Sequence, residues 1–96
     1  MKIIFKESFI RRLENQVEYI ALDSPVRARK FKTELLNRIK GIAFNPTQNR
    51  KSIYFEDANI RDLIYKGYTI VYRIQDTAIE IFGFVKYQDS PIDDPE

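Results

Sequence analysis

The feature that most constrains this chain is a change in the spacing of its apolar residues, from a helical period to a strand period. One face of an amphipathic helix is predicted by apolar residues spaced by four, four and three positions: Phe9, Leu13, Val17 and Ile20. Ser24-Pro25 then predicts the start of a second helix, because serine caps free backbone N–H groups and proline suits the first helical position. The second helix continues with the same spacing over Ala28, Phe31, Leu35, Ile39 and Ile42. Two consecutive helices with so short a link form an αα-hairpin.

In the rest of the chain, residues alternate between two faces as they do in β-strands. We expect strands over residues 2–6, 59–66, 68–74 and 78–85, with turns at Lys66-Gly67 and Gln75-Asp76-Thr77. Residues 45–58, which begin at Asn45-Pro46, are expected to form an irregular connection. The order β-α-α-β-β-β predicts an α+β fold, in which a helical hairpin packs on a small, mostly antiparallel sheet.

The alternation also assigns faces to the strands. On the last strand we expect Ile79, Ile81 and Val85 on one face, and Glu80, Phe82 and Phe84 on the other. Both faces of the sheet then carry apolar residues. The helices cover one face, and the other is either covered by another segment or is a binding surface.

Composition excludes several classes of site. The chain has 96 residues, without cysteine or histidine, so disulfides, thiol catalysis, histidine bases and the commonest metal ligands are absent. We expect one domain over residues 1–87, an acidic tail over 88–96, and neither metal nor cofactor. No apolar run is long enough to span a membrane and no signal peptide follows Met1, so we expect a cytoplasmic protein with no membrane partner.

Charge is unevenly distributed along the chain. Residues 1–50 hold eleven Lys and Arg against five Asp and Glu, a net of +6, and residues 51–96 hold five against nine, a net of −4. The exposed face of the second helix is the basic part: Arg27, Arg29, Lys30, Lys32, Arg38 and Lys40. Such a face is either simply solvated or contacts an acidic partner or nucleic acid.

The residues that remain for chemistry are cations, carboxylates and tyrosines. Cations can stabilise a phosphorane-like transition state, with Tyr or Lys carrying the proton, as in metal-free RNA cleavage. The candidates in the connection are Arg50, Lys51 and Tyr54, and those on the sheet and at its end are Arg61, Arg73, Lys86 and Tyr87. Each has a plainer interpretation. In that interpretation, Arg50 and Lys51 are solvated loop cations. Arg73 then pairs with Asp62 or Glu80 across strands. Lys86 and Tyr87 then simply end a strand.

In their order and spacing, these segments resemble the RelE/ParE superfamily of bacterial toxins. The helical part of the resemblance runs from Ile20 through Ser24-Pro25 to Pro46. In the sheet, Ile60-Arg61-Asp62-Leu63 resembles the family's "vReL" strand, residues 67–74 resemble its "gYRivYRi" strand, and residues 79–86 resemble its last strand.

The resemblance implies a toxin of a type II toxin–antitoxin pair, held inactive by a cognate antitoxin. RelE-like members cut mRNA on the ribosome, and ParE-like members inhibit DNA gyrase. For a nuclease, the resemblance implies that Arg73 and Lys51 stabilise the phosphate and that Lys86 or Tyr87 moves the proton. For Arg50, Tyr54 and Arg61 we expect binding roles.

Three positions depart from the nuclease pattern. Thr69 stands where the arginine of "gYR" is usual, Ile64 where one nuclease branch has another arginine, and Lys86 where a histidine is frequent. A site that lacks these groups has less charge to stabilise phosphoryl transfer. The departures therefore favour a gyrase inhibitor over an mRNA endonuclease. A non-toxic homologue kept as a binding module is a further alternative.

Overall fold

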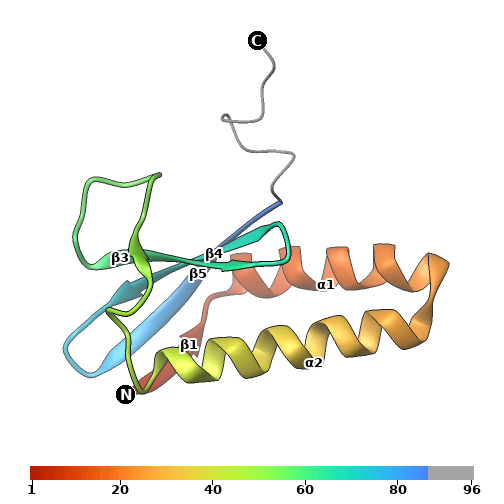
Figure 1. The fold of residues 1–96 in the computed structure, drawn as a ribbon, viewed down its shortest axis with the longest axis horizontal. Coiled ribbons are helices and arrows are strands. Elements are labelled where there is room, and N and C mark those ends of the chain that lie inside the picture. Colours follow the sequence, from red (N-terminus) through yellow and green to blue (C-terminus); the bar gives the residue numbers. More distant parts are fainter. Residues whose placement is uncertain (87–96) are drawn as a thin grey trace, which may run out of the picture.

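A computed structural model describes residues 1–86 of the chain. Its elements are, in order, β1 (Lys2–Phe5), α1 (Glu7–Asp23), α2 (Pro25–Ile42), β2 (Arg50–Lys51), β3 (Ile60–Tyr65), β4 (Tyr68–Ile74) and β5 (Ala78–Lys86) (Figure 1). Tyr87 and the predicted acidic tail over 88–96 lie outside the described residues, so the domain boundary there stays a prediction.

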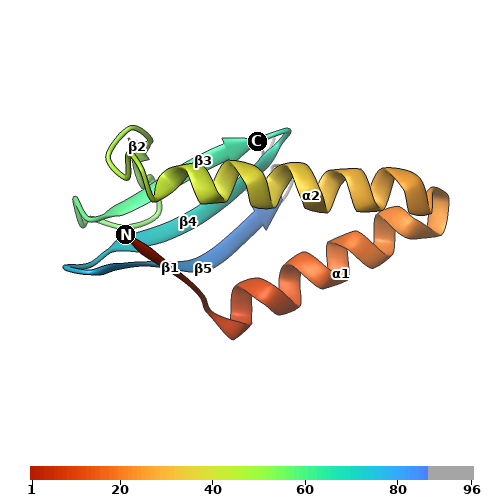
Figure 2. The same ribbon diagram turned by 90° about the horizontal axis from the view of Figure 1, so that it is seen from below.

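The two helices form the predicted hairpin around Ser24. The Ser24 side chain accepts a hydrogen bond from the backbone N–H of Arg27 at 3.2 Å, and Pro25 occupies the first position of α2. This cap satisfies one of the free N–H groups at the start of the helix. The connected ends of α1 and α2 project past the edge of the sheet, so the tip of the hairpin has no sheet behind it (Figure 2).

The sheet has five strands in the order β1-β5-β4-β3-β2. β1 pairs with β5 in parallel and the other three pairings are antiparallel, which confirms the predicted α+β arrangement. β2 was not predicted. It lies within the segment expected to be irregular and pairs only Arg50 with Asp62 and Lys51 with Arg61. Two residues are too few for alternation to show in a sequence.

The β3–β4 hairpin turns at the predicted residues. Lys66 and Gly67 have φ angles of 48° and 83°, the left-handed values that a two-residue turn requires at both central positions. The turn fixes the register of the two strands, with Tyr65 opposite Tyr68 and Leu63 opposite Ile70. It therefore decides which side chains of β3 and β4 face the helices.

The core lies between the hairpin and one face of the sheet, here called the helix face. Its members are Phe9 and Leu13 of α1, Leu35, Ile39 and Ile42 of α2, and Leu63, Tyr65, Ile70, Tyr72, Ile79, Ile81 and Phe84 of the sheet. A fully buried side chain of this kind contributes about 1.5–3 kcal/mol through the hydrophobic effect. The core therefore fixes α1 and α2 against the sheet.

β5 breaks its alternation at Phe82. Val71 pairs with Gly83 but Tyr72 pairs with Ile81, so Phe82 is the extra residue of a β-bulge. The bulge reverses the faces beyond it: Phe84 is buried in the core, whereas Val85 shares the outer face with its partner Thr69. The predicted grouping of Val85 with Ile79 and Ile81 is therefore wrong, because it assumed an unbroken strand.

Gly83 makes this close pairing possible. A Cβ atom at residue 83 would lie 2.9 Å from the Cβ of Val71, closer than two such atoms can approach. Any larger residue there would push β4 and β5 apart beside the bulge.

The outer face of the sheet, which points away from the helices, is covered in part by residues 52–59. This segment arches over the face between β2 and β3 (Figure 1). The Phe55 ring lies edge-on to Phe82, with centroids 5.7 Å apart, and the backbone N–H of Ile53 donates to Asp62 at 3.1 Å. Part of this face is thus covered by the chain itself, which is one of the two alternatives that the sequence left open.

Candidate functional site

Asp62 organises the outer face near β2. Its side chain is 0% exposed, and its Oδ2 accepts hydrogen bonds from Arg50 Nε at 3.3 Å and Nη2 at 3.2 Å. Oδ1 has no hydrogen-bond partner among residues 1–86. A buried carboxylate without its cation is costly, since its charge is no longer compensated. Arg50 therefore serves to compensate the charge of the buried Asp62 carboxylate.

Arg61 ties the connection to the sheet. Its Nε donates to the carbonyl of Ala58 at 3.0 Å, and its Nη1 donates to the carbonyls of Thr47 and Asn49 at 3.2 and 3.0 Å. These bonds hold both ends of the segment between α2 and β3. Lys51 pairs opposite Arg61 and is exposed.

Tyr54 lies in the same connection and is half-buried. Its backbone N–H donates to Ser52 Oγ at 3.1 Å. This bond shapes the segment that covers the outer face, and it involves the backbone of Tyr54 rather than its ring.

Arg73 projects from β4 on the outer face. Its Nη1 lies 3.6 Å from Glu80 Oε1 on β5, and its guanidinium carbon lies 5.5 Å from the centre of the Phe82 ring. The cross-strand pair with Glu80 is one of the two pairings that the sequence allowed. Asp62, the other predicted partner, pairs with Arg50 instead.

Lys86 lies on the opposite face of the sheet from Arg73. It pairs with Tyr68, whose ring packs against Phe31 of α2, so its side chain points toward the helices. Its Nζ lies over the ring of Tyr19 on α1, 5.2 Å from the centre. Among the described candidates, the structure thus gathers Arg50, Lys51 and Arg61 around β2 and β3, and separates them from Lys86. Tyr87 lies outside the described residues.

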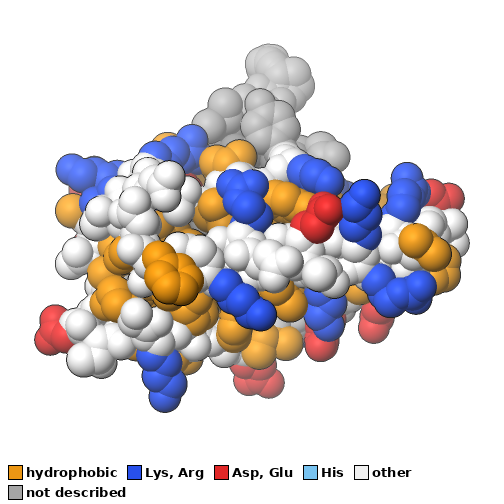
Figure 3. All heavy atoms as spheres, turned by 60° about the horizontal axis from the view of Figure 1, so that its bottom comes forward, with side chains coloured by type: hydrophobic (Ala, Val, Ile, Leu, Met, Phe, Trp, Pro, Cys, Tyr) orange, Lys and Arg blue, Asp and Glu red, His pale blue; other side chains and the backbone are white. Residues whose placement is uncertain are grey.

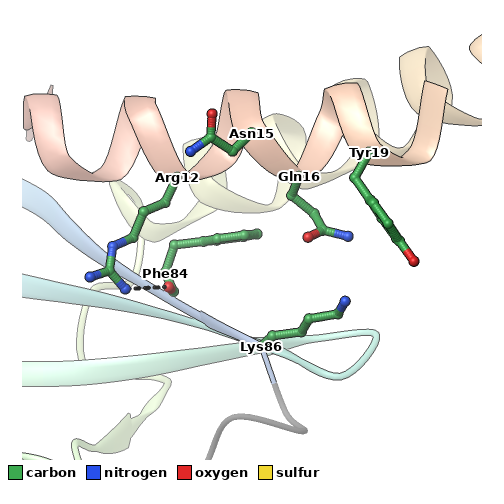
Figure 4. A pocket seen from close by; sticks show the side chains of 6 residues that line it. All are labelled: Arg12, Asn15, Gln16, Tyr19, Phe84 and Lys86. Carbon is green, nitrogen blue, oxygen red and sulfur yellow. Dashed lines mark hydrogen bonds between the residues drawn. The ribbon is translucent and has the colours of Figure 1, made fainter. Parts of the chain in front are cut away.

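A cleft between α1 and β5 contains Lys86. Its volume is about 350 Å³, and its lining residues are Arg12, Asn15, Gln16, Tyr19, Phe84 and Lys86 (Figure 4). β1 ends at Phe5 opposite Ile81, so the edge of β5 beyond that point faces α1 instead of a strand. Two α1 side chains bond to this edge: Ser8 Oγ donates to the carbonyl of Phe82 at 3.0 Å, and Arg12 Nη1 donates to the carbonyl of Phe84 at 3.5 Å.

The wall of the cleft is fixed by Gln16. Its amide Nε2 donates to the Tyr68 hydroxyl at 2.7 Å, and burial raises the pKa of that hydroxyl above its ordinary value. Tyr68 stacks on Phe84, with ring centres 5.1 Å apart. The floor of the cleft is therefore aromatic and held in place, while its rim carries cations and amides.

Sequence reasoning found Lys86 but missed the four residues that α1 contributes: Arg12, Asn15, Gln16 and Tyr19. Their spacing of three and four residues is a signal, because it forms a second stripe on α1 beside the apolar one. The sequence does not reveal which strand this stripe faces, since that depends on how the hairpin crosses the sheet.

On the face of the molecule shown in Figure 3, Lys and Arg side chains are spread out rather than gathered in one patch. Large apolar side chains are exposed at the tip of the hairpin, where Tyr19, Leu22 and Val26 are 63%, 86% and 66% exposed. Residues 1–86 hold no group of three or more metal-ligating side chains. None of the helices in this range is long and apolar enough to cross a membrane.

Comparison with known proteins identifies the family. The sequence matches the family of the ParE toxin of the type II toxin–antitoxin system, parDE, over residues 3–89. The fold is similar to a chain in the solved structure of the chromosomal ParDE toxin–antitoxin system from P. aeruginosa, with a TM-score of 0.74 and 17% identity. That similarity covers 90% of this chain and 95% of the other. No curated protein matches the sequence. Because the family match spans almost the whole chain, the protein belongs to the ParE toxin family of type II toxin–antitoxin systems.

Proposed function

We propose that this protein arrests growth by binding DNA gyrase, and that its cognate antitoxin prevents this contact. Membership of the family supports the toxin role and implies an antitoxin as partner. The observation that carries the choice of target is the separation of Arg73 and Lys86 onto opposite faces of the sheet.

Metal-free RNA cleavage requires its catalytic side chains to lie close together. Cations must surround the reacting phosphate, and the proton carrier must lie within hydrogen-bond reach of the attacking or leaving oxygen. Here Arg73 lies on the outer face with Glu80, whereas Lys86 lies on the helix face over Tyr19. Lys51 is on β2, with β3 and β4 between it and β5. This arrangement does not favour a nuclease built from these three residues.

Two other candidate cations, Arg50 on the outer face and Arg61 on the helix face, already have partners. Arg50 bonds to the buried Asp62, and Arg61 bonds to three carbonyl groups. Inhibition of gyrase through a protein contact requires no catalytic residues. The exposed apolar tip of the hairpin, with Tyr19, Leu22 and Val26, is typical of a surface that meets another protein.

The test is induced expression in bacteria with pulse-labelling of DNA and protein synthesis in one culture. We expect DNA synthesis to fall first, and purified toxin to inhibit supercoiling by gyrase in vitro. Co-expression of the antitoxin should restore both. If protein synthesis falls first, the protein acts as a ribosome-dependent mRNA endonuclease and the gyrase proposal is wrong. If neither falls, it is a binding module without toxicity.

A further inference from the structure

A second cleft lies at the end of α2 that is farthest from the tip of the hairpin (Figure 2). Its volume is about 260 Å³, and its lining combines amides with one cation and one glycine: Asn37, Arg38, Gly41, Asn45, Gln48 and Asn49. We propose that this cleft, here called the amide cleft, binds the sugar–phosphate backbone of DNA. The inference rests on the proposed function only in the choice of DNA, on which gyrase acts, as the nucleic acid.

The segment that forms most of the amide cleft contains no carboxylate. No Asp or Glu occurs between Glu34 and Glu56, whereas residues 35–55 hold several cations: Arg38, Lys40, Arg50 and Lys51. Arg50 pairs with Asp62, but the other three form no ion pair within residues 1–86. A phosphate that approaches this end of α2 therefore meets positive charge, although the whole chain has a net charge of only +2.

Arg38 is the cation that lines the cleft itself. Its guanidinium carbon lies 5.5 Å from the centre of the Tyr65 ring, and its Nη2 donates one long bond of 3.4 Å to the carbonyl of Ile64. Within residues 1–86 most of its N–H groups have no acceptor, so they can donate to a phosphate oxygen. Lys51 pairs with Arg61 and therefore lies on the helix face, as Leu63 at the cleft does.

The loop after α2, which carries three of the amides, is held in place by the sheet. Arg61 donates to the carbonyls of Thr47 and Asn49 at 3.2 and 3.0 Å. Asn49 Nδ2 donates to the Tyr72 hydroxyl at 3.2 Å, and that hydroxyl donates to the carbonyl of Pro46 at 2.6 Å. Because these bonds fix the loop before a ligand arrives, little conformational entropy is lost when the amides bind.

Gly41 keeps the cleft open. A Cβ atom at residue 41 would have no other atom within 4 Å, and the φ angle of Gly41 is not in the left-handed region. Neither packing nor backbone conformation requires a glycine here, where it destabilises the helix relative to alanine. The missing side chain instead leaves room for a ligand in the cleft.

The lining favours a nucleic acid over a protein as the ligand. Arginine and amide side chains supply many of the hydrogen bonds that proteins donate to DNA phosphates and base edges. The apolar residues of the cleft, Ile42 and Leu63, are 2% and 3% exposed, so they offer no pocket for the apolar anchor of a protein interface. Phe44 is 89% exposed at this end of α2 and can contact a sugar or base.

The two ends of the helical hairpin therefore differ in chemistry. The tip exposes the apolar side chains of Tyr19, Leu22 and Val26, whereas the opposite end of α2 presents amides and cations. The toxin can thus contact gyrase and the DNA on it through different surfaces.

The experiment measures binding of the purified full chain to a short fluorescein-labelled DNA duplex by anisotropy over a range of salt concentrations. The first test variant is Arg38→Gln. Its matched control is Arg29→Gln, which makes the same change of charge at an exposed residue of the same helix. We expect Arg38→Gln to lower the affinity about tenfold at low salt and to reduce the salt slope by about 1, because one phosphate contact is lost. The control should bind as the wild type does.

A second variant, Gly41→Leu, tests the cleft without changing the charge. The leucine side chain should occupy the cleft and lower the affinity for the duplex by about threefold or more. Its melting temperature should equal or exceed that of the wild type, because leucine favours a helix more than glycine does.

The proposal is supported if Arg38→Gln and Gly41→Leu both weaken binding and Arg29→Gln does not. It is overturned if the wild type does not bind the duplex at low salt, if Arg29→Gln loses as much affinity as Arg38→Gln, or if Gly41→Leu binds as tightly as the wild type. Tighter binding of a single-stranded RNA of the same sequence also overturns it. Melting temperatures close to that of the wild type show that the variants fold. The measurement contains no gyrase, so failure of the gyrase proposal leaves its result unaffected.

Discussion

The cations on the outer face of the sheet and those in the α1/β5 cleft have opposite situations. On the outer face, Arg50 pairs with a buried carboxylate and Arg73 with a cross-strand carboxylate. Arg61, on the helix face opposite Tyr72, bonds to three backbone carbonyls. Arg12 and Lys86 border a cleft that has no acidic side chain among residues 1–86. The difference teaches that a basic residue in a functional-looking sequence motif can serve the structure. The two cations of the cleft, in contrast, come from elements far apart in the chain and have no carboxylate partner among residues 1–86.

The largest effect is expected from removing the acceptor of Arg50. Asp62→Ala should lower the free energy of unfolding by about 2–4 kcal/mol, because Arg50 and the N–H of Ile53 both lose a buried partner. Urea denaturation measures this. Asp76→Ala, at an exposed turn, is the control and should change stability by less than about 0.5 kcal/mol. Equal effects of the two variants would show that Asp62 is not the anchor.

Arg61→Ala should cost about 1–3 kcal/mol, since three carbonyl groups lose their donor. The connection between α2 and β3 should also become more sensitive to limited proteolysis, which is the more specific measurement. Lys51→Ala, at the position opposite on β2, provides the comparison. Cleavage at the same rate in both variants would mean that Arg61 does not hold the connection.

Arg73→Gln should cost at most about 1 kcal/mol, because Arg73 is 44% exposed and its pair with Glu80 is long. If the toxin acts by protein contact elsewhere, growth arrest should persist in cells that express this variant at the wild-type level. Loss of growth arrest with the fold intact would assign Arg73 a functional role and revive the nuclease interpretation.

Arg12→Gln with Lys86→Gln should have the smallest effect on stability, within about 0.5 kcal/mol of wild type, because neither cation has a carboxylate partner in the described part of the chain. Thermal melts at low and high salt check this. A loss above about 1.5 kcal/mol at both salt concentrations would show that these cations stabilise the fold, and the contrast with the outer face would disappear.

The fold was largely predictable because its signals are local. The helical spacing before and after Ser24, the cap itself and the two-residue turn at Lys66-Gly67 each depend on neighbouring residues, and the structure confirms them. The faces beyond Phe82 were not predictable, because a bulge depends on how two strands pair. The partners of Arg50 and Arg61, and the cleft of Arg12, depend on contacts across 12 to 72 residues of sequence, which periodicity does not encode.

The parallel pairing of β1 with β5 has a consequence for folding. Ile3 pairs with Ile79, so the first strand has no strand partner until the last one has been synthesised. The helical hairpin and the β3–β4 hairpin involve short loops and can form early, whereas this pairing closes a loop of almost the whole described chain and carries the largest entropy cost. A translation product that stops before residue 78 therefore lacks β5, leaves β1 without a strand partner and β4 paired only with β3, and has no α1/β5 cleft. In the order of synthesis, β5 and the cleft that it forms with α1 are the last of the described parts to exist.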